Sequence, residues 1–281
     1  MMSNQGYILV NAKNAQKIEL EFWENLQKNG REVELKYARD LPECTPDFIL
    51  DMIAEFEHKA AEFCFQGAQG RILDAGCGNG NLLTRTLKQN SGNITYVGLD
   101  FSRNMLRRAA TRAKTLDYAT FLRGCISNLP FEDESFDRVI SSGVITCLPS
   151  YKDARDSLKE FYRLLRPVGI LAVDFFNQGS HFAWFRRHIL RERLEPPEFI
   201  SYSEFKADLE RVGFKIMDYL GFDYKPFQGY LFQSRMRPII DPFFVQERFT
   251  RLVEARLIPK MPILSLCGYR IYVKCVKNRL R

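Results

Sequence analysis

The sequence has no uninterrupted apolar run as long as the about 20 residues that a bilayer-spanning helix requires. Its seven cysteines include no Cys-x-x-Cys pair, which argues against a zinc site and a disulfide framework. Only three histidines occur, and no metal-ligand spacing is present. The N-terminal residues lack the charged and apolar segments of a secretory signal peptide. These absences predict a cytoplasmic protein without a resident metal.

Alternating strand and helix patterns fill the middle of the 281-residue chain, which is 46% hydrophobic. Apolar residues at helical spacing also predict helices between residues 14 and 66. The alternation predicts a doubly wound, Rossmann-like α/β fold with a mostly parallel sheet of seven strands. The expected strands are 71–75, 94–99, 119–124, 137–142, 168–175, 214–221 and Tyr269–Val276, and the expected helices within the core are 80–89, 102–114, 151–165 and 202–212.

Residues 71–80 read Arg-Ile-Leu-Asp-Ala-Gly-Cys-Gly-Asn-Gly and carry the strongest functional signal. An apolar run ends at Asp74, glycines follow at alternate positions, and a helical pattern opens at Asn81. Glycine tolerates positive φ and lets the backbone approach a ligand closely. The segment therefore predicts a strand, a tight turn and a helix that border a ligand crevice at the carboxyl end of the sheet.

The spacing of this turn narrows the class of ligand. A dinucleotide-binding Gly-x-Gly-x-x-Gly motif starting at Gly76 would need a glycine where Asn81 stands, and the Gly-Lys-Ser/Thr of a P-loop is absent. A second acid, Asp100, follows the turn by about twenty residues, where a carboxylate can accept from ribose hydroxyls. Asp74 would repel a pyrophosphate, whereas it suits a ligand with amino and sulfonium cations.

With these motifs the chain resembles the class I S-adenosylmethionine-dependent methyltransferases, of the UbiE-like, small-molecule, methyltransferase type 11 kind. The resemblance covers roughly residues 70–178. It rests on four segments in order: Ile72–Gly80, Val97–Ser102, Leu129–Asp137 and Leu164–Pro167.

The resemblance implies S-adenosylmethionine as cofactor and S-adenosylhomocysteine as product. The backbone at Gly76–Gly80 would approach the methionine part, with Asp74 near its cationic end. Asp100 would bind the ribose, and Phe101 and Met105 would flank the adenine. The full expected cofactor site is Asp74, Gly76, Cys77, Gly78, Gly80, Asp100, Phe101, Ser102, Met105, Cys125, Ile126, Ser127, Ser142 and Gly143.

Three positions depart from the family pattern. Cys125 stands where an aspartate commonly accepts from the adenine amino group, and a thiol is a weak acceptor, so Ser127 or a backbone carbonyl would substitute. Val168 replaces a turn glycine, and Cys147 replaces a frequent histidine. The loss of that histidine removes one obvious base.

The ends of the fourth and fifth strands are expected to face the sulfonium. Besides Ser142 and Gly143, these positions are Cys147, Asp174, Phe176 and Asn177. His181 follows the fifth strand and is the candidate catalytic base. His58 is expected to be structural or exposed, and His188 to meet solvent or an anionic group. Tyr202 and Tyr224 could orient an acceptor or only pack.

The resemblance and the spacing divide the chain into three parts. Residues 1–66 form a helical segment over the cofactor site, 67–178 form the cofactor-binding core, and 179–281 contribute the last strands and a lid. Two long aromatic and basic insertions, 177–200 and 222–267, would form this lid over the acceptor. Residues 179–281 contain 19 Lys/Arg and 11 Asp/Glu and so carry all of the net positive charge. The positive charge of this lid suits an anionic acceptor or an anionic surface, and its aromatic residues suit an apolar-aromatic acceptor. A basic exterior that only meets solvent would explain the charge equally well.

The favoured function is methyl transfer to a small or medium-sized metabolite, preferably at oxygen. RNA methylation is less favoured because no RNA-binding module and no Asn-Pro-Pro-Tyr/Phe signature is present. Peripheral membrane contact through 182–191, with a lipid, quinone or glycolipid acceptor, stays open. A non-catalytic binding subunit is least favoured because Asp74, the glycines and Asp100 are all intact. The sequence leaves the oligomeric state undetermined.

Overall fold

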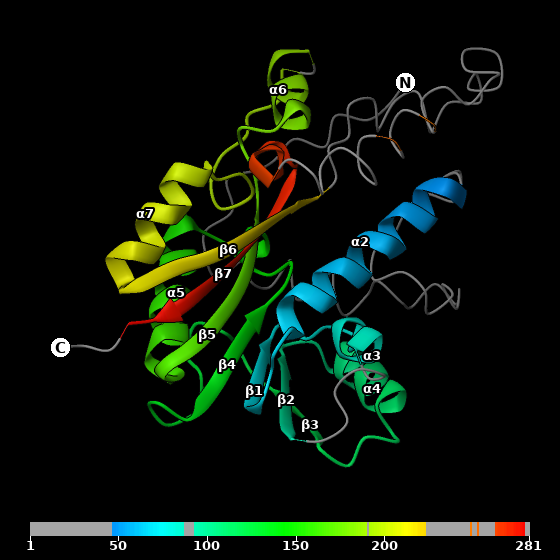
Figure 1. Ribbon diagram of the computed structural model, residues 1–281, viewed down its shortest axis with the longest axis vertical. Coiled ribbons are helices and arrows are strands. Elements are labelled where there is room, and N and C mark those ends of the chain that lie inside the picture. Colours follow the sequence, from blue (N-terminus) through cyan, green and yellow to red (C-terminus); the bar gives the residue numbers. More distant parts are fainter. Residues whose placement is uncertain are drawn as a thin grey trace.

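The computed structural model describes residues 47–86, 93–189, 191–222, 248, 252 and 262–278. The predicted seven-stranded sheet is confirmed, with strand order β3-β2-β1-β4-β5-β7-β6 (Figure 1). Its strands are β1 (Gly70–Ala75), β2 (Ile94–Asp100), β3 (Ala119–Arg123), β4 (Phe136–Ser141), β5 (Leu165–Phe176), β6 (Phe214–Phe222) and β7 (Arg270–Lys277). The helices are α2 (Asp47–Phe65), α3 (Asn81–Thr86), α4 (Arg103–Arg112), α5 (Tyr151–Leu164), α6 (His181–His188) and α7 (Tyr202–Val212), with 3₁₀ turns η1 (Ile145–Cys147) and η4 (Pro262–Cys267).

The sheet is parallel from β3 through β5, and β7 enters antiparallel between β5 and β6. Strand order reverses at β1, which pairs with β2 on one side and β4 on the other. In doubly wound sheets the ligand crevice opens at such a reversal, outside the carboxyl ends of the strands. This reversal lies where the glycine-rich turn follows β1.

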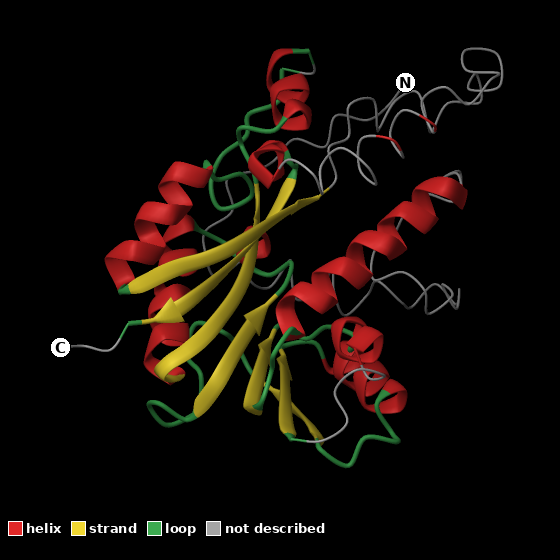
Figure 2. Cartoon of the chain, viewed as in Figure 1, coloured by secondary structure: helices red, strands yellow, loops and turns green. Residues whose placement is uncertain are grey.

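Helices cover both faces of the sheet, with α2, α3 and α4 on one side and α5 and α7 on the other (Figures 1 and 2). Successive side chains of a strand point to opposite faces of the sheet, so alternate residues pack against the helices on one face and on the other. Leu73 is buried with Leu158 and Phe161 of α5, whereas Ile72 is buried with Ala60 of α2. The near-continuous apolar strands of the sequence are thus explained by burial on both faces.

Two buried cations hold the carboxyl end of α2 against the sheet. Arg138 Nη1 on β4 donates to the carbonyls of Cys64 (2.5 Å) and Gln66 (3.1 Å). Lys274 Nζ on β7 donates to Gln66 Oε1 at 3.3 Å and lies 4.3 Å from the ring centre of Phe63. These bonds satisfy carbonyls that the helix end leaves without intrahelical partners. They also fix the helix beside the crevice.

Several boundaries differ from the sequence-based expectations. β5 begins at Leu165 rather than 168, and Val168 adopts φ +63°. The insertion 177–200 contains α6, which projects beyond the sheet in Figure 1. Residues 1–46, most of 222–267 and Tyr224 lie outside the described residues, and the helix expected at 80–89 is described as far as Thr86. No helix in the described ranges is both long and apolar enough to cross a membrane.

Candidate functional site

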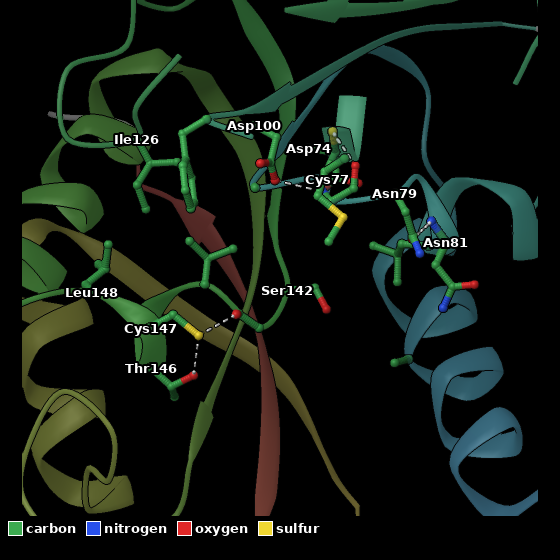
Figure 3. Close-up of a pocket in the computed structure, with 18 of the residues that line it drawn as sticks. Asp74, Cys77, Asn79, Asn81, Asp100, Ile126, Ser142, Thr146, Cys147 and Leu148 are labelled. Atoms are coloured by element: carbon green, nitrogen blue, oxygen red, sulfur yellow. Dashed lines mark hydrogen bonds between the residues drawn. The ribbon is translucent and has the colours of Figure 1, made fainter. Parts of the chain in front are cut away.

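A cavity of about 720 Å³ opens at the carboxyl ends of β1, β2 and β4, and α2 and β7 add to its walls. In Figure 3, Asp74, Cys77 and Asp100 lie together on one side, and Thr146, Cys147 and Leu148 lie across from them. Its volume is in the upper part of the range of small-molecule sites. The cavity has room for a cofactor and a second molecule.

The turn after β1 brings its backbone to this cavity. Gly76 and Cys77 donate their N–H groups to the Leu99 carbonyl at 2.7 and 3.0 Å, which ties the turn to β2. Gly76 has φ +85°, and a Cβ there would lie 2.2 Å from Val144 Cγ2. At Gly78 (φ +52°) the Cβ position is open space, so the backbone itself faces a ligand.

Asp100, the last residue of β2, is hydrogen-bonded to the glycine-rich turn. Its two carboxylate oxygens accept from the backbone N–H groups of Gly78 and Ser102, each at 2.9 Å. The carboxylate is 7% exposed and lines the cavity. A carboxylate has further acceptor positions beyond these two bonds, so Asp100 can also accept from hydroxyls of a bound sugar.

Asp74 is 1% exposed at the bottom of the cavity, where the Tyr96 hydroxyl donates to its Oδ2 at 2.6 Å. Burial raises the pKa of Asp74 to about 7, against the Tyr96 hydrogen bond that lowers it, and repulsion from Asp100 adds to the rise. A cationic ligand beside this carboxyl would favour its ionised form.

The far wall is built by β4 and the 3₁₀ turn η1. Gly143 donates its N–H to Asp174 Oδ1 at 2.5 Å, and Cys147 Sγ donates to the Gly143 carbonyl at 3.4 Å. The residues of this wall that line the cavity are Ser142, Gly143, Val144, Thr146, Cys147, Leu148 and Pro149, together with Phe176 and Tyr269. This half of the cavity is mainly apolar.

Comparison with known proteins agrees with this geometry. The family model described as a methyltransferase domain matches residues 72–169. The chain is 40% identical over 144 residues to phthiotriol/phenolphthiotriol dimycocerosates methyltransferase 1 of Mycobacterium ulcerans, covering 50% of this chain and 49% of that protein. It is 28% identical over 170 residues to the ubiquinone/menaquinone biosynthesis C-methyltransferase UbiE of Geotalea daltonii, covering 52% and 71%. Residues 72–169 therefore match a methyltransferase domain, and the chain is similar to S-adenosylmethionine-dependent methyltransferases.

A solved structure supports the fold over nearly the whole chain. The putative sarcosine dimethylglycine methyltransferase from Galdieria sulphuraria superposes with a TM-score of 0.56, 14% identity and coverage of 94% of this chain and 98% of that one. At this identity the likeness concerns the fold alone. The sequence match spans about half the length of the Mycobacterium relative.

S-adenosylmethionine is the cofactor of this methyltransferase family, and the residues of the cavity fit it. The open position at Gly78, the buried carboxyl of Asp74 and the accepting carboxylate of Asp100 match a ligand with a sulfonium, an amino group and ribose hydroxyls. Eleven of the fourteen predicted cofactor residues line the cavity: Asp74, Gly76, Cys77, Gly78, Asp100, Phe101, Met105, Cys125, Ile126, Ser142 and Gly143.

Three predicted cofactor residues do not line this cavity. Ser102 is fully buried and caps α4, its Oγ accepting from Met105 N at 3.3 Å. A Cβ at Gly80 would lie 3.1 Å from Ala109 Cα, so this glycine serves the close packing of the loop on α4. Ser127 is exposed, although its Oγ lies 3.2 Å from Cys125 Sγ.

The residues expected near the sulfonium are only partly brought together. Cys147 and Phe176 line the cavity, whereas the exposed His181, at the start of α6, does not. Asp174 is fully buried and binds Gly143 and Arg270. Asn177 donates to the carbonyls of Leu266 and Gly268, which makes it a structural residue of the η4 turn.

Sequence reasoning missed two groups of cavity residues. On α2 and α3, Glu57 Oε2 accepts from Asn81 Nδ2 and from Arg85 Nη2, each at 2.7 Å, and all three residues line the cavity. On the β7 side, Tyr269, Arg270 and Tyr272 line it. Neither group left a usable signal, because partners 24 or more residues apart are joined by tertiary packing and not by a local pattern.

Proposed function

We propose that this protein transfers a methyl group from S-adenosylmethionine to an oxygen of a small or medium-sized acceptor with an apolar body. The observation that carries the proposal is the continuity of one cavity, from the carboxylates of Asp74 and Asp100 to the apolar wall at Leu148 and Phe176. A cofactor and an acceptor held in one water-poor space can be aligned for in-line displacement. The names of the two relatives, which mention dimycocerosates and ubiquinone/menaquinone, support an acceptor of this kind.

When bound, S-adenosylmethionine supplies a methyl group already activated by the sulfonium. The residues then have three tasks: Asp74 faces the cationic end, Asp100 holds the ribose, and the apolar wall excludes water. Within the described ranges the cavity contains no histidine. Positioning is therefore expected to contribute more than proton abstraction by a side chain.

Calorimetric titration with S-adenosylmethionine and S-adenosylhomocysteine tests the cofactor half of the proposal. Micromolar binding of either is expected, and the absence of both from the folded protein would contradict it. Incubation of acceptor mixtures with methyl-deuterated S-adenosylmethionine, followed by mass spectrometry, tests the transfer. NMR of the labelled product distinguishes an oxygen-bound methyl from a carbon-bound one, and a carbon-bound methyl would correct the proposed atom.

A second proposal concerns how the acceptor arrives. Trp184 and Arg187 on α6 are exposed, Trp184 by 58%, and Ile189, directly after the helix, is 57% exposed. Aromatic and basic groups on one exposed surface suit contact with an anionic membrane. In a flotation experiment with phosphatidylglycerol vesicles, the wild-type protein should rise with the vesicles and Trp184→Ala should not. Equal flotation of the two proteins would refute membrane contact through this surface.

A further inference from the structure

The β7 side of the cavity contains a cation, Arg270, that was not among the expected cofactor residues. Arg270 is the first residue of β7, and its side chain lines the cavity while being only 13% exposed. Its Nε donates to Asp174 Oδ2 on β5, the strand that pairs with β7. Asp174 also accepts from Gly143 N, so both of its oxygens are engaged.

The ion pair presents its positive end to the cavity. Asp174 is fully buried and does not line the cavity, whereas Arg270 does. Burial alone lowers the pKa of Arg270, but attraction to Asp174 outweighs it and raises the pKa, so the guanidinium stays charged. Among the described residues its bonds go to Asp174 and to Ser142 Oγ (3.3 Å), which leaves N–H donors of the guanidinium for a ligand.

An aromatic ring lies against this cation, and two more line the same cavity. The guanidinium carbon lies 5.0 Å from the ring centre of Tyr272, whose hydroxyl is 2.8 Å from Ser142 Oγ. Burial raises the pKa of Tyr272, so its hydroxyl stays protonated. Phe176 and Tyr269 stack at 4.7 Å between ring centres and also line the cavity. A cation beside aromatic walls fits a ring or chain that carries a negatively charged oxygen.

We propose that Arg270, held by Asp174 and flanked by Ser142 and Tyr272, anchors an ionised oxygen of the methyl acceptor. The acceptor class is then an apolar, preferably aromatic molecule with an acidic hydroxyl, enol or carboxyl group. This inference rests on the proposed function and names the substrate class of the same cavity. A guanidinium and an oxyanion form charge-assisted hydrogen bonds, which are stronger than hydrogen bonds between neutral groups, especially in a cavity of low polarity.

An ionised acceptor also accounts for a cavity lined without histidine in its described part. When an anionic oxygen forms the new C–O bond and the S–CH₃ bond breaks, the products are a neutral methyl ether or ester and a neutral thioether. No proton has to leave the acceptor during that step. The protein then needs a group that stabilises the anion before transfer, and Arg270 supplies it.

The test uses two probes of similar shape and different charge, titrated by calorimetry into the full chain saturated with S-adenosylhomocysteine at pH 7.5. The anionic probe is 1-hydroxy-2-naphthoate and the neutral probe is 1-naphthol. We expect the anionic probe to bind about tenfold tighter or better, as one charge-assisted contact allows. Binding of S-adenosylhomocysteine is measured first. If it does not bind, the proposed function is refuted; if it binds but the anionic probe is not preferred, only the anion site is refuted.

The decisive variant is Arg270→Gln combined with Asp174→Asn. Both charges are removed together because Arg270→Gln alone would leave Asp174 buried without its cation. The double variant should bind S-adenosylhomocysteine and 1-naphthol as the wild type does and lose the preference for the anionic probe. Arg187→Gln, which removes one exposed positive charge on α6, is the matched control and should keep it. Equal affinity of the wild type for both probes, binding of neither, or a preference that survives in the double variant would each overturn the proposal.

Discussion

The affinity for S-adenosylmethionine should depend on pH through Asp74. The pKa of this buried carboxyl is raised to about 7, chiefly by burial, so about half of the free protein carries it protonated at neutral pH. A cofactor with cationic groups favours the ionised form. Binding therefore has to displace a proton, and the apparent affinity falls as the pH is lowered through 7.

The size of this effect follows from the pKa. If only the ionised form of Asp74 binds the cofactor, the apparent Kd is weakened about 1.3-fold at pH 7.5 and about 30-fold at pH 5.5. The ratio of about 25 corresponds to about 2 kcal/mol of binding free energy. Calorimetry at both pH values, in buffers of different ionisation enthalpy, measures the affinity and the proton release together.

Two variants identify the titrating group. Asp74→Asn should bind weakly and lose the pH dependence that runs through this carboxyl, so that only titration of the ligand's own groups remains. Tyr96→Phe removes the hydrogen bond that lowers the Asp74 pKa, so the midpoint should move upward. A wild-type Kd that is constant from pH 5.5 to 7.5, or the same pH dependence in Asp74→Asn, would refute the reasoning.

The same pKa has a consequence for the free protein. The folded-state pKa lies above the unfolded value near 4, so the contribution of Asp74 to stability is present at low pH and is lost as the pH rises through 7. The thermal stabilisation by S-adenosylmethionine should accordingly be larger at pH 7.5 than at pH 5.5. Differential scanning fluorimetry at the two values checks this.

Three further outcomes can be measured directly. Asp100→Ala should weaken S-adenosylmethionine binding about 100-fold by calorimetry, because it loses charge-assisted ribose bonds and the bond to Gly78 N; an unchanged Kd would refute the ribose placement. Val168→Gly should raise the free energy of unfolding by about 1 kcal/mol in urea, since Val168 is 55% exposed at φ +63°, and a loss of stability would contradict that reasoning. Arg138→Met should lower the free energy of unfolding by about 2 kcal/mol, because the carbonyls of Cys64 and Gln66 lose their Arg138 donor; an unchanged value would mean that water replaces the guanidinium.

Local patterns predicted much of the fold. Each parallel strand and each helix of the core was visible as a short apolar run or a helical period, since both faces of the sheet are buried. The glycine spacing at 76–80 and the acids at 74 and 100 predicted the cofactor half of the cavity, because a turn and the residues that end a strand are set by neighbours in the chain. Family resemblance added the ligand itself.

The β7 wall of the cavity was decided by tertiary structure. Arg270 and Asp174 are 96 residues apart and meet because β7 pairs antiparallel with β5. The predicted base, His181, lies only a few residues beyond Phe176, yet the exposed start of α6 places it outside the cavity lining.

The sequence by itself therefore determined the seven-stranded sheet, the glycine turn and the paired acids Asp74 and Asp100. These depend on backbone conformation and burial, which short segments encode. Which cation lines the β7 wall of the cavity, and which polar residues are only structural, depended on pairing across the sheet. The reason is physical: strand register and layer packing bring distant side chains within hydrogen-bond reach, and no local spacing specifies that contact.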